Sequence, residues 1–149
     1  MDPPVEMMTD FRLAIRADVS TLAQMNHWLI QDEGHRNPMS LAELESRMRA
    51  WLDGEYHAAL FEEGDRTVGY ALYRFDEEWV YLRQFFVQRE DRRKGIGRAA
   101  LRWLAANPWK GTPRIRLEVL SGNLVGQEFW KALGFEVYAL TFELDPLPE

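Results

Sequence analysis

The sequence contains no cysteine and no long apolar run, and these absences exclude several classes of protein. Without cysteine there is no disulfide bond, no thiolate nucleophile and no zinc site with sulfur ligands. No apolar run reaches the roughly 18 residues that a membrane-spanning helix needs. The net charge of −6 argues against binding of nucleic acid through a broad basic face. We therefore expect a cytoplasmic protein with no nucleic-acid partner and no membrane partner.

Several catalytic motifs are also missing. His27, His35 and His57 show no spacing typical of metal ligands, and neither HExxH nor GxSxG occurs, so we expect no metal and no serine hydrolase chemistry. Residues 1–10 have neither the basic nor the apolar region of a signal peptide and are expected to form a flexible tail. The rest of the 149 residues, 11–149, is the size of one domain.

Hydrophobic periodicity predicts alternating strands and helices after this tail. Strands are expected at 11–16, 56–63, 67–75, 79–87, 114–120 and 135–144. Helices are expected after Asp18 and after the capping box of Ser40 and Glu43, and they are expected to begin near Ile96 and Asn123. This order predicts a single α/β (α+β) domain with about four helices. Its sheet should be mixed but mostly antiparallel, with one crossover from 79–87 to 114–120.

The segment RRKGIG, residues 92–97, concentrates positive charge just before a predicted helix. Cations are unusual there because the helix dipole favours anions at the N-terminus. They become favourable when a bound anion lies between them and the exposed N–H groups. Gly95 and Gly97 have no Cβ, so a ligand can approach their backbone closely. We therefore expect a phosphate group to bind here; a solvated turn is the simpler alternative.

Known phosphate-binding motifs narrow the choice of ligand. The P-loop motif GxxxxGK[ST] is absent, whereas Gly95, Gly97 and Ala100 match the dinucleotide motif GxGxxA, with Glu118 near the place of its ribose-binding acid. In the dinucleotide fold, however, the glycines follow the strand almost at once. Here the seven residues 88–94 separate the strand from the first glycine. A dinucleotide-binding domain is thus a more remote alternative.

Three stretches together resemble the GNAT superfamily of acyl-CoA-dependent N-acetyltransferases. YLRQFFV (81–87), followed by RRKGIG (92–97), resembles the strand and the Q/R-x-x-G-x-G pyrophosphate loop of that family. IRLEVL (115–120) resembles its diverging strand, and NLVGQEFWKALGF (123–135) resembles its N-x-x-A-x-x-[FL]-[YW]-x-x-x-G-F helix. The resemblance covers nearly the whole chain from residue 11. It implies a GNAT-like fold with splayed central strands.

The resemblance implies an activity, a co-substrate and a set of contacts. The activity is transfer of an acetyl group from acetyl-CoA to a primary amine of a small molecule or of a peptide or protein N-terminus, by direct attack in a ternary complex. Backbone groups of 85–87 would pair with the pantetheine arm, and the amides of 93–98 would hold the pyrophosphate. The residues implied to bind acetyl-CoA are Phe85, Phe86, Val87, Arg92, Arg93, Lys94, Gly95, Ile96, Gly97, Arg98, Asn123 and Trp130.

Glu118 is the candidate general base, because the resemblance places it where some family members carry theirs. An amine of pKa about 10.4 is neutral only about once in 2,500 at pH 7, a handicap of roughly 4.6 kcal/mol, whereas a thiol of pKa about 8.5 leaves readily. Deprotonating the amine therefore matters more than protonating the sulfur. Position 130 is often a tyrosine in the family, where it acts as the general acid that protonates the leaving sulfur. The indole of Trp130 cannot supply a proton at neutral pH. Three alternatives stay open. Glu118 could be an ordinary surface residue, and Trp130 could form a wall of the acyl or pantetheine pocket or simply pack in the core. The whole protein could be a non-catalytic acyl-CoA sensor with the same fold.

The acceptor side is expected at the first two helices and the loop between them. The polar residues there are Asn26, Asp32, Glu33, His35 and Arg36. Arg83, a charged residue in an apolar strand, could reach the same space. Asp32 and Glu33 suit a cationic amine while Arg36 and Arg83 suit a carboxylate, which predicts an amino acid or a peptide terminus as the acceptor. The aromatic strands permit a homodimer without requiring one.

Overall fold

A five-stranded mixed sheet forms the centre of the first part of the chain. The computed structural model describes residues 9–34 and 36–146, which divide into two compact units, Met1–Glu118 and Val119–Glu149, each described here by itself. The sheet order is β1 (Asp10–Leu13), β2 (Tyr56–Glu63), β3 (Arg66–Phe75), β4 (Val80–Val87) and β5 (Ile115–Arg116). Neighbours from β1 to β4 are antiparallel, and β5 runs parallel to β4. The predicted mixed, mostly antiparallel sheet with one crossover is confirmed.

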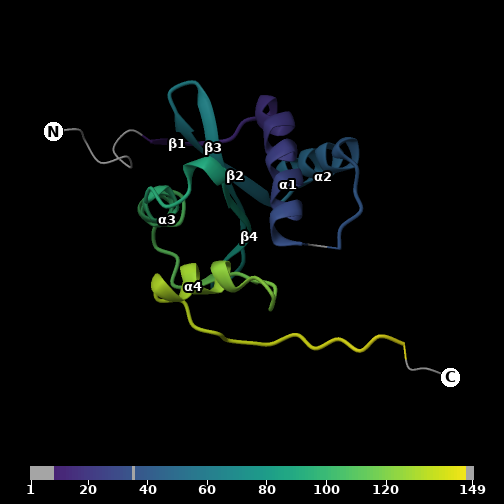
Figure 1. The fold of residues 1–149 in the computed structure, drawn as a ribbon. Coiled ribbons are helices and arrows are strands. Elements are labelled where there is room, and N and C mark those ends of the chain that lie inside the picture. The colour runs from purple at the N-terminus through teal and green to yellow at the C-terminus, as the bar shows by residue number, and fades with distance from the viewer. Residues whose placement is uncertain (1–8, 35, 147–149) are drawn as a thin grey trace. The chain divides into compact units, whose positions relative to one another are not determined.

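Helices cover both faces of this sheet (Figure 1). On one face lie α1 (Val19–Glu33) and α2 (Leu41–Asp53), and on the other lies α3 (Ile96–Ala106). α1 buries Leu22 and Met25 in the cluster that also holds Tyr70 of β3. On the α3 side, Trp103 stacks on Phe11 of β1 with ring centroids 5.8 Å apart. Because successive strand residues point to opposite faces, the alternating apolar residues of β2 and β3 fill both layers.

The predicted helix starts are confirmed in position, but one of the three caps expected from the sequence, Asp18, is wrong. At α2, Ser40 accepts from the backbone N–H of Glu43 and the Glu43 carboxylate accepts from the N–H of Ser40, which is the expected capping box. Asp18 makes no such bond at α1. Its carboxylate instead accepts two bonds of 2.9 Å from Arg12 and one of 2.7 Å from the N–H of Ile15. The Arg12 guanidinium lowers the pKa of Asp18.

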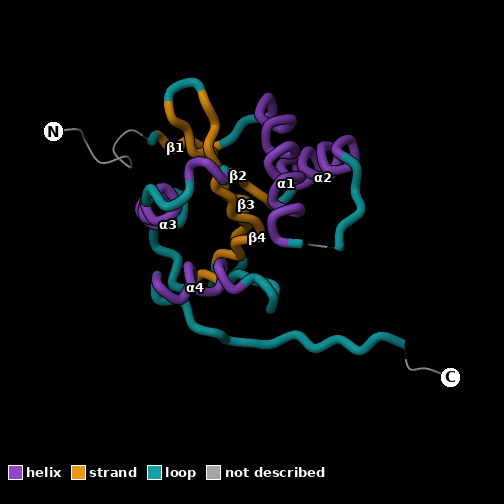
Figure 2. The backbone as a smooth tube through the Cα atoms, in the orientation of Figure 1, coloured by secondary structure: helices purple, strands orange, loops and turns teal. Residues whose placement is uncertain are grey.

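Two predicted strands differ from the structure. The strand expected at 114–120 is formed only at Ile115–Arg116, and the one expected at 135–144 is not formed. Figure 2 shows the segment after α4 as loop. The side chains of Val137, Leu140 and Phe142 are 67%, 72% and 88% exposed. Alternating apolar residues suit a strand, but a strand also needs a neighbouring backbone to bond with, and sequence periodicity carries no information about that neighbour.

The second unit contains α4 (Leu124–Ala132). Asn123 caps this helix as predicted, since its side-chain oxygen accepts a bond of 3.0 Å from the backbone N–H of Gly126. Gly134, with a φ of 99°, follows the last turn. Within the unit, the Trp130 ring packs edge-on against Phe129 and Phe135, with centroids 4.9 and 5.2 Å away.

Candidate functional site

β4 separates from β5 after a short paired stretch. The two strands pair only at Val80 with Ile115 and at Tyr81 with Arg116. Along the described part of residues 9–118, no further strand pairs with this edge of β4. On its other edge, β4 contains a bulge, because Leu72 and Tyr73 of β3 pair with Gln84 and Leu82 and leave Arg83 as the extra residue. This divergence is the splayed arrangement expected from the sequence.

The segment after β4 leads directly into the N-terminus of α3. A 3-10 turn, Arg89–Asp91, precedes the basic residues, and α3 begins at Ile96 with Gly95 in the left-handed region at a φ of 82°. The N–H of Ala99 donates to the carbonyl of Gly95 over 3.0 Å. The N–H groups of residues 96–98 therefore precede the first hydrogen bond of the helix and point out of its N-terminus. Such a terminus is suited to binding an anion.

Some of the cations in this segment are already paired. Arg89 and Arg92 both form ion pairs with Asp32 of α1, and the Nε of Arg92 donates to the carbonyl of Val87 over 2.8 Å. The side chain of Asp32, expected at the acceptor, is thus placed against the basic segment. In contrast, Arg93 and Arg98 have no carboxylate within 4 Å among the described residues of the first unit. These two guanidiniums remain available to a bound anion.

A buried ion pair fixes the turn before the glycines. Asp91 is fully buried and accepts bonds of 2.8 and 2.6 Å from the two terminal nitrogens of Arg66, at the start of β3. Lys94 lies 3.7 Å from the same carboxylate. The hydrogen bonds from the Arg66 guanidinium are the main cause that lowers the pKa of Asp91. The position of the basic segment is therefore tied to the sheet through a charge-assisted, two-point contact.

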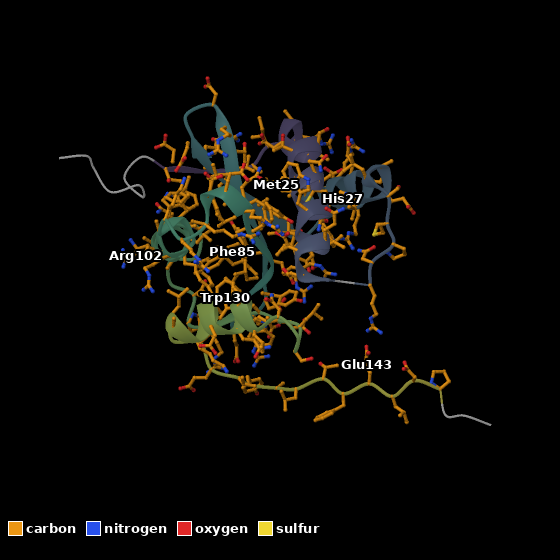
Figure 3. All side chains as sticks on the ribbon, viewed as in Figure 1. Met25, His27, Phe85, Arg102, Trp130 and Glu143 are labelled. Carbon is orange, nitrogen blue, oxygen red and sulfur yellow. The ribbon has the colours of Figure 1, made fainter. Side chains whose placement is uncertain are left out.

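Among the expected coenzyme residues of β4, the Phe86 side chain is buried in the core, whereas those of Phe85 and Val87 are half-buried. Phe85 packs against Phe61 at 5.5 Å, and Phe86 packs against Tyr70 at 6.3 Å. Figure 3 labels Phe85 on β4 and Met25 on α1. Only the backbone of residues 85–87 was expected to contact the coenzyme.

Glu118 lies within hydrogen-bonding reach of β4. The phenol of Tyr81 donates to Oε1 of Glu118 over 2.8 Å, and the Glu118 side chain is exposed. Burial, together with Glu118, raises the pKa of Tyr81 to about 12, so this phenol stays protonated at neutral pH. Sequence reasoning missed Tyr81, because the register that places it opposite β5 is a property of the folded sheet.

Arg83 joins a cluster of residues that sequence reasoning did not connect. Its Nη1 donates to the phenol oxygen of Tyr56 over 3.3 Å, and its guanidinium lies 4.8 Å from the ring centroid of Trp51. Arg47 of α2, not considered from the sequence, lies 4.3 Å from the same ring and donates to Oδ1 of the buried Asn26 over 3.1 Å.

The remaining expected acceptor residues lie at the end of α1. Glu33 is its last residue, and Arg36 lies in the connection between α1 and α2. His35 lies outside the described residues. The expected acceptor residues therefore lie in two places. Asp32 contacts the basic segment, whereas Asn26 and Arg83 lie with Arg47 in the cluster around Trp51.

Residues 9–34 and 36–146 contain neither a helix suited to span a membrane nor a group of side chains suited to a metal ion. No helix in these ranges is long and apolar enough to cross a membrane. No three His, Asp or Glu side chains of the same residues are grouped so that they could hold a metal ion.

Several solved structures are similar to this chain in fold. A possible acetyltransferase from Clostridium difficile 630 superposes with a TM-score of 0.78 at 18% identity, covering 95% of this chain and 99% of that one. A predicted acetyltransferase from Clostridium acetobutylicum, solved with acetyl-CoA, gives 0.74 at 19% identity, with 93% and 96% covered. A ribosomal-protein-alanine N-acetyltransferase from Brucella melitensis biovar Abortus 2308 gives 0.74 at 14%, with 92% and 99% covered.

At these identities the structural likeness establishes the fold alone. No curated protein matches the chain. The model of the acetyltransferase (GNAT) family matches residues 22–135, which is most of the sequence. The chain therefore belongs to the acetyltransferase (GNAT) family.

Proposed function

We propose that the protein transfers an acetyl group from acetyl-CoA to a primary amine, by direct attack of the amine within a ternary complex. The observation that carries this proposal is the N-terminus of α3, where free N–H groups and two available guanidiniums follow the separated edge of β4. Family membership supports acyl transfer, and a relative of the same fold was solved with acetyl-CoA.

The diphosphate of the coenzyme would bind at the start of α3. The N–H groups of residues 96–98 would donate to its oxygens, and Arg93 and Arg98 would offset its charge. Gly95 suits this place because a residue with a φ of 82° is strained unless it lacks a Cβ. The Arg66–Asp91 pair would keep the segment in position before the coenzyme arrives.

Glu118 would act on the acceptor. The amine nitrogen forms a bond to the thioester carbonyl carbon, the carbon–sulfur bond breaks with its electron pair on sulfur, and the amine proton goes to the Glu118 carboxylate. One carboxylate oxygen accepts from Tyr81, which orients the group and leaves the second oxygen for the amine. The thiolate leaves without a strong acid because the thiol pKa is only about 8.5.

A thermal-shift titration tests the coenzyme site. Acetyl-CoA, CoA and NADPH are added separately to the purified protein, and a ligand that binds only the folded state raises the melting temperature. We expect shifts with acetyl-CoA and CoA but none with NADPH. A shift with NADPH alone would instead indicate a dinucleotide-binding domain.

Activity is tested separately by measuring release of the CoA thiol over a panel of primary amines. We expect at least one amine to accelerate thiol release above hydrolysis, with the acetylated amine found by mass spectrometry. Binding of acetyl-CoA without turnover on any amine would contradict the catalytic proposal and leave a non-catalytic acyl-CoA sensor.

A further inference from the structure

Two arginines from different elements meet at one indole ring. The guanidinium carbons of Arg47 on α2 and Arg83 on β4 lie 4.3 and 4.8 Å from the ring centroid of Trp51. Tyr56, on β2, accepts from Arg83 over 3.3 Å and from Arg74 over 2.8 Å. Four elements, α2, β2, β3 and β4, thus bring three cations to two aromatic rings.

Two of the three cations in this cluster have no carboxylate beside them in the described part of the chain. Arg74 has a carboxylate, that of Asp76, at 3.3 Å. Among the described residues, neither Arg47 nor Arg83 has a carboxylate within 4 Å. Burial and the charge of Arg83 both lower the pKa of Arg47, as expected for a cation held near another cation. Arg47 is half-buried whereas Arg83 is exposed, so it is the partly buried charge of Arg47 that a bound anion would stabilise most.

Hydrogen-bond donors in the same place also lack partners. Within the part of the chain that the structure describes, the Nε of Arg47 and the Nδ2 of Asn26 are buried and make no hydrogen bond. Asn26 is itself fully buried on α1, and its oxygen holds the Nη2 of Arg47. Buried donors without partners are rare in folded proteins. A ligand oxygen in the cluster would satisfy groups that the fold leaves unsatisfied.

The position of the cluster separates it from the expected diphosphate site. Arg83 precedes Val87, the last residue of β4, by four positions, or about 13 Å at the usual rise along a strand. The start of α3 lies beyond that end. By contrast, Arg74, which donates to Tyr56 of the cluster, lies with its guanidinium 4.8 Å from the ring centroid of Tyr81, the residue that donates to Glu118. The cluster is therefore on the side of the candidate base, where the acceptor would lie.

We propose that Arg47 and Arg83 bind an oxyanionic group, a carboxylate or a phosphate, that is part of the acceptor, so that the acceptor carries its amine and its anion in one small molecule. This inference rests on the proposed acetyl transfer. The guanidinium forks suit either anion, and the faces of Trp51 and Tyr56 hold the forks in place. The acceptor is then an amino acid or an aminoalkyl phosphate.

The test compares acceptors that differ only in the anion. Thiol release is measured for an amino acid and its amide, with the amine-to-anion spacing varied by using α-, β- and γ-amino acids, and for phosphoethanolamine and ethanolamine. We expect the wild type to have the lower KM for the anionic member of at least one pair. The better pair distinguishes carboxylate from phosphate. Equal KM values within every pair would overturn the proposal.

Substitutions of Arg83 and Arg47 test whether these residues bind the anion of the acceptor. Arg83→Gln should raise the KM of the anionic acceptor about 10- to 100-fold, the range expected for loss of charged hydrogen bonds, while the KM values of the neutral acceptor and of acetyl-CoA stay unchanged. Arg47→Lys keeps the charge but loses the fork and should act in the same direction. Arg102→Gln is the matched control, because Arg102 is exposed on the outer side of α3 (Figure 3). Equal losses for anionic and neutral acceptors would contradict an anion-binding role.

A binding measurement separates this inference from the proposed function. Acetate and inorganic phosphate are titrated into 15N-labelled protein at constant ionic strength, and the Nε–H signals of the arginines are followed by NMR. Shifts of the Arg47 and Arg83 signals in the wild type, with the Arg47 shift lost in Arg83→Gln, support the anion site even if no amine releases thiol. Unmoved signals overturn it even if acetyl transfer is found.

Discussion

Replacing Glu118 with glutamine tests the proposed proton transfer. Glutamine retains a carbonyl oxygen that can accept from Tyr81 over the present 2.8 Å, so the geometry is preserved while the base is lost. Loss of a general base typically lowers the rate 10²- to 10⁴-fold, which corresponds to about 2.7 to 5.4 kcal/mol at about 1.36 kcal/mol per tenfold change. This is comparable to the handicap of roughly 4.6 kcal/mol for finding an alkyl amine neutral at pH 7.

The pH dependence of the reaction rate is the most specific test of this prediction. Without a base, only amine that is already neutral reacts, so the rate of Glu118→Gln should rise about tenfold per pH unit below the amine pKa of about 10.4. The ratio of wild-type to variant turnover should therefore be largest at low pH and shrink as the pH rises. The assay is steady-state thiol release from pH 6 to 9.5, with saturating acetyl-CoA and the acceptor varied.

Two further variants control the measurement. Glu77→Gln removes an exposed carboxylate from the turn between β3 and β4 and should leave the rate unchanged. Tyr81→Phe removes the donor to Glu118 and should lower kcat about tenfold with little effect on the KM of acetyl-CoA, since Tyr81 acts by positioning the base. A Glu118→Gln rate within about twofold of the wild type at every pH would remove Glu118 from the mechanism.

Three further outcomes follow from contacts near the site. Asp91→Asn should weaken acetyl-CoA binding in calorimetry by loosening the anchor to Arg66. The Arg66 guanidinium lowers the pKa of Asp91 in the folded state. The wild type should therefore be more stable to unfolding than Asp91→Asn above about pH 4 and should lose this advantage in stronger acid. Equal acid unfolding curves of the two proteins would contradict this expectation. Gly69→Ala should destabilise the sheet by at least about 1–3 kcal/mol in urea unfolding, since its Cβ would lie 2.3 Å from the carbonyl oxygen of Phe86, and an unchanged midpoint would refute this. Asn123→Ala should cost about 1 kcal/mol through loss of the α4 cap, whereas Asn123→Ser should restore most of it.

Local chemistry made much of the fold predictable. Ser40 and Glu43 form their capping box within four residues, and Asn123 caps α4 with one bond from the N–H of Gly126, three residues on. β2 and β3 lie where strands were predicted at 56–63 and 67–75, and Gly64, with a φ of 61°, lies in the turn between them. Asp18 shows the limit of this reasoning, because a guanidinium six residues away competes for its carboxylate.

The candidate site was only partly predictable for the same reason. The composition of the basic glycine segment predicts an anion site, and the structure adds the N–H groups at the start of α3 that precede its first hydrogen bond. The Tyr81–Glu118 bond joins residues 37 positions apart, and the Arg47–Asn26 bond joins residues 21 apart. No periodicity or local motif links such pairs.

The sequence by itself therefore determined the positions of the helices and of the first four strands, the caps of α2 and α4, and the place where cations and glycines gather before α3, since each depends on residues within a few positions of one another. Only the tertiary structure decided how far β4 and β5 stay paired, that residues 135–144 form no strand, and which arginines of the described residues have no carboxylate within 4 Å. These outcomes depend on the register between strands and on the packing of helices against them. That packing brings distant residues together through the whole fold and leaves no local signal in the sequence.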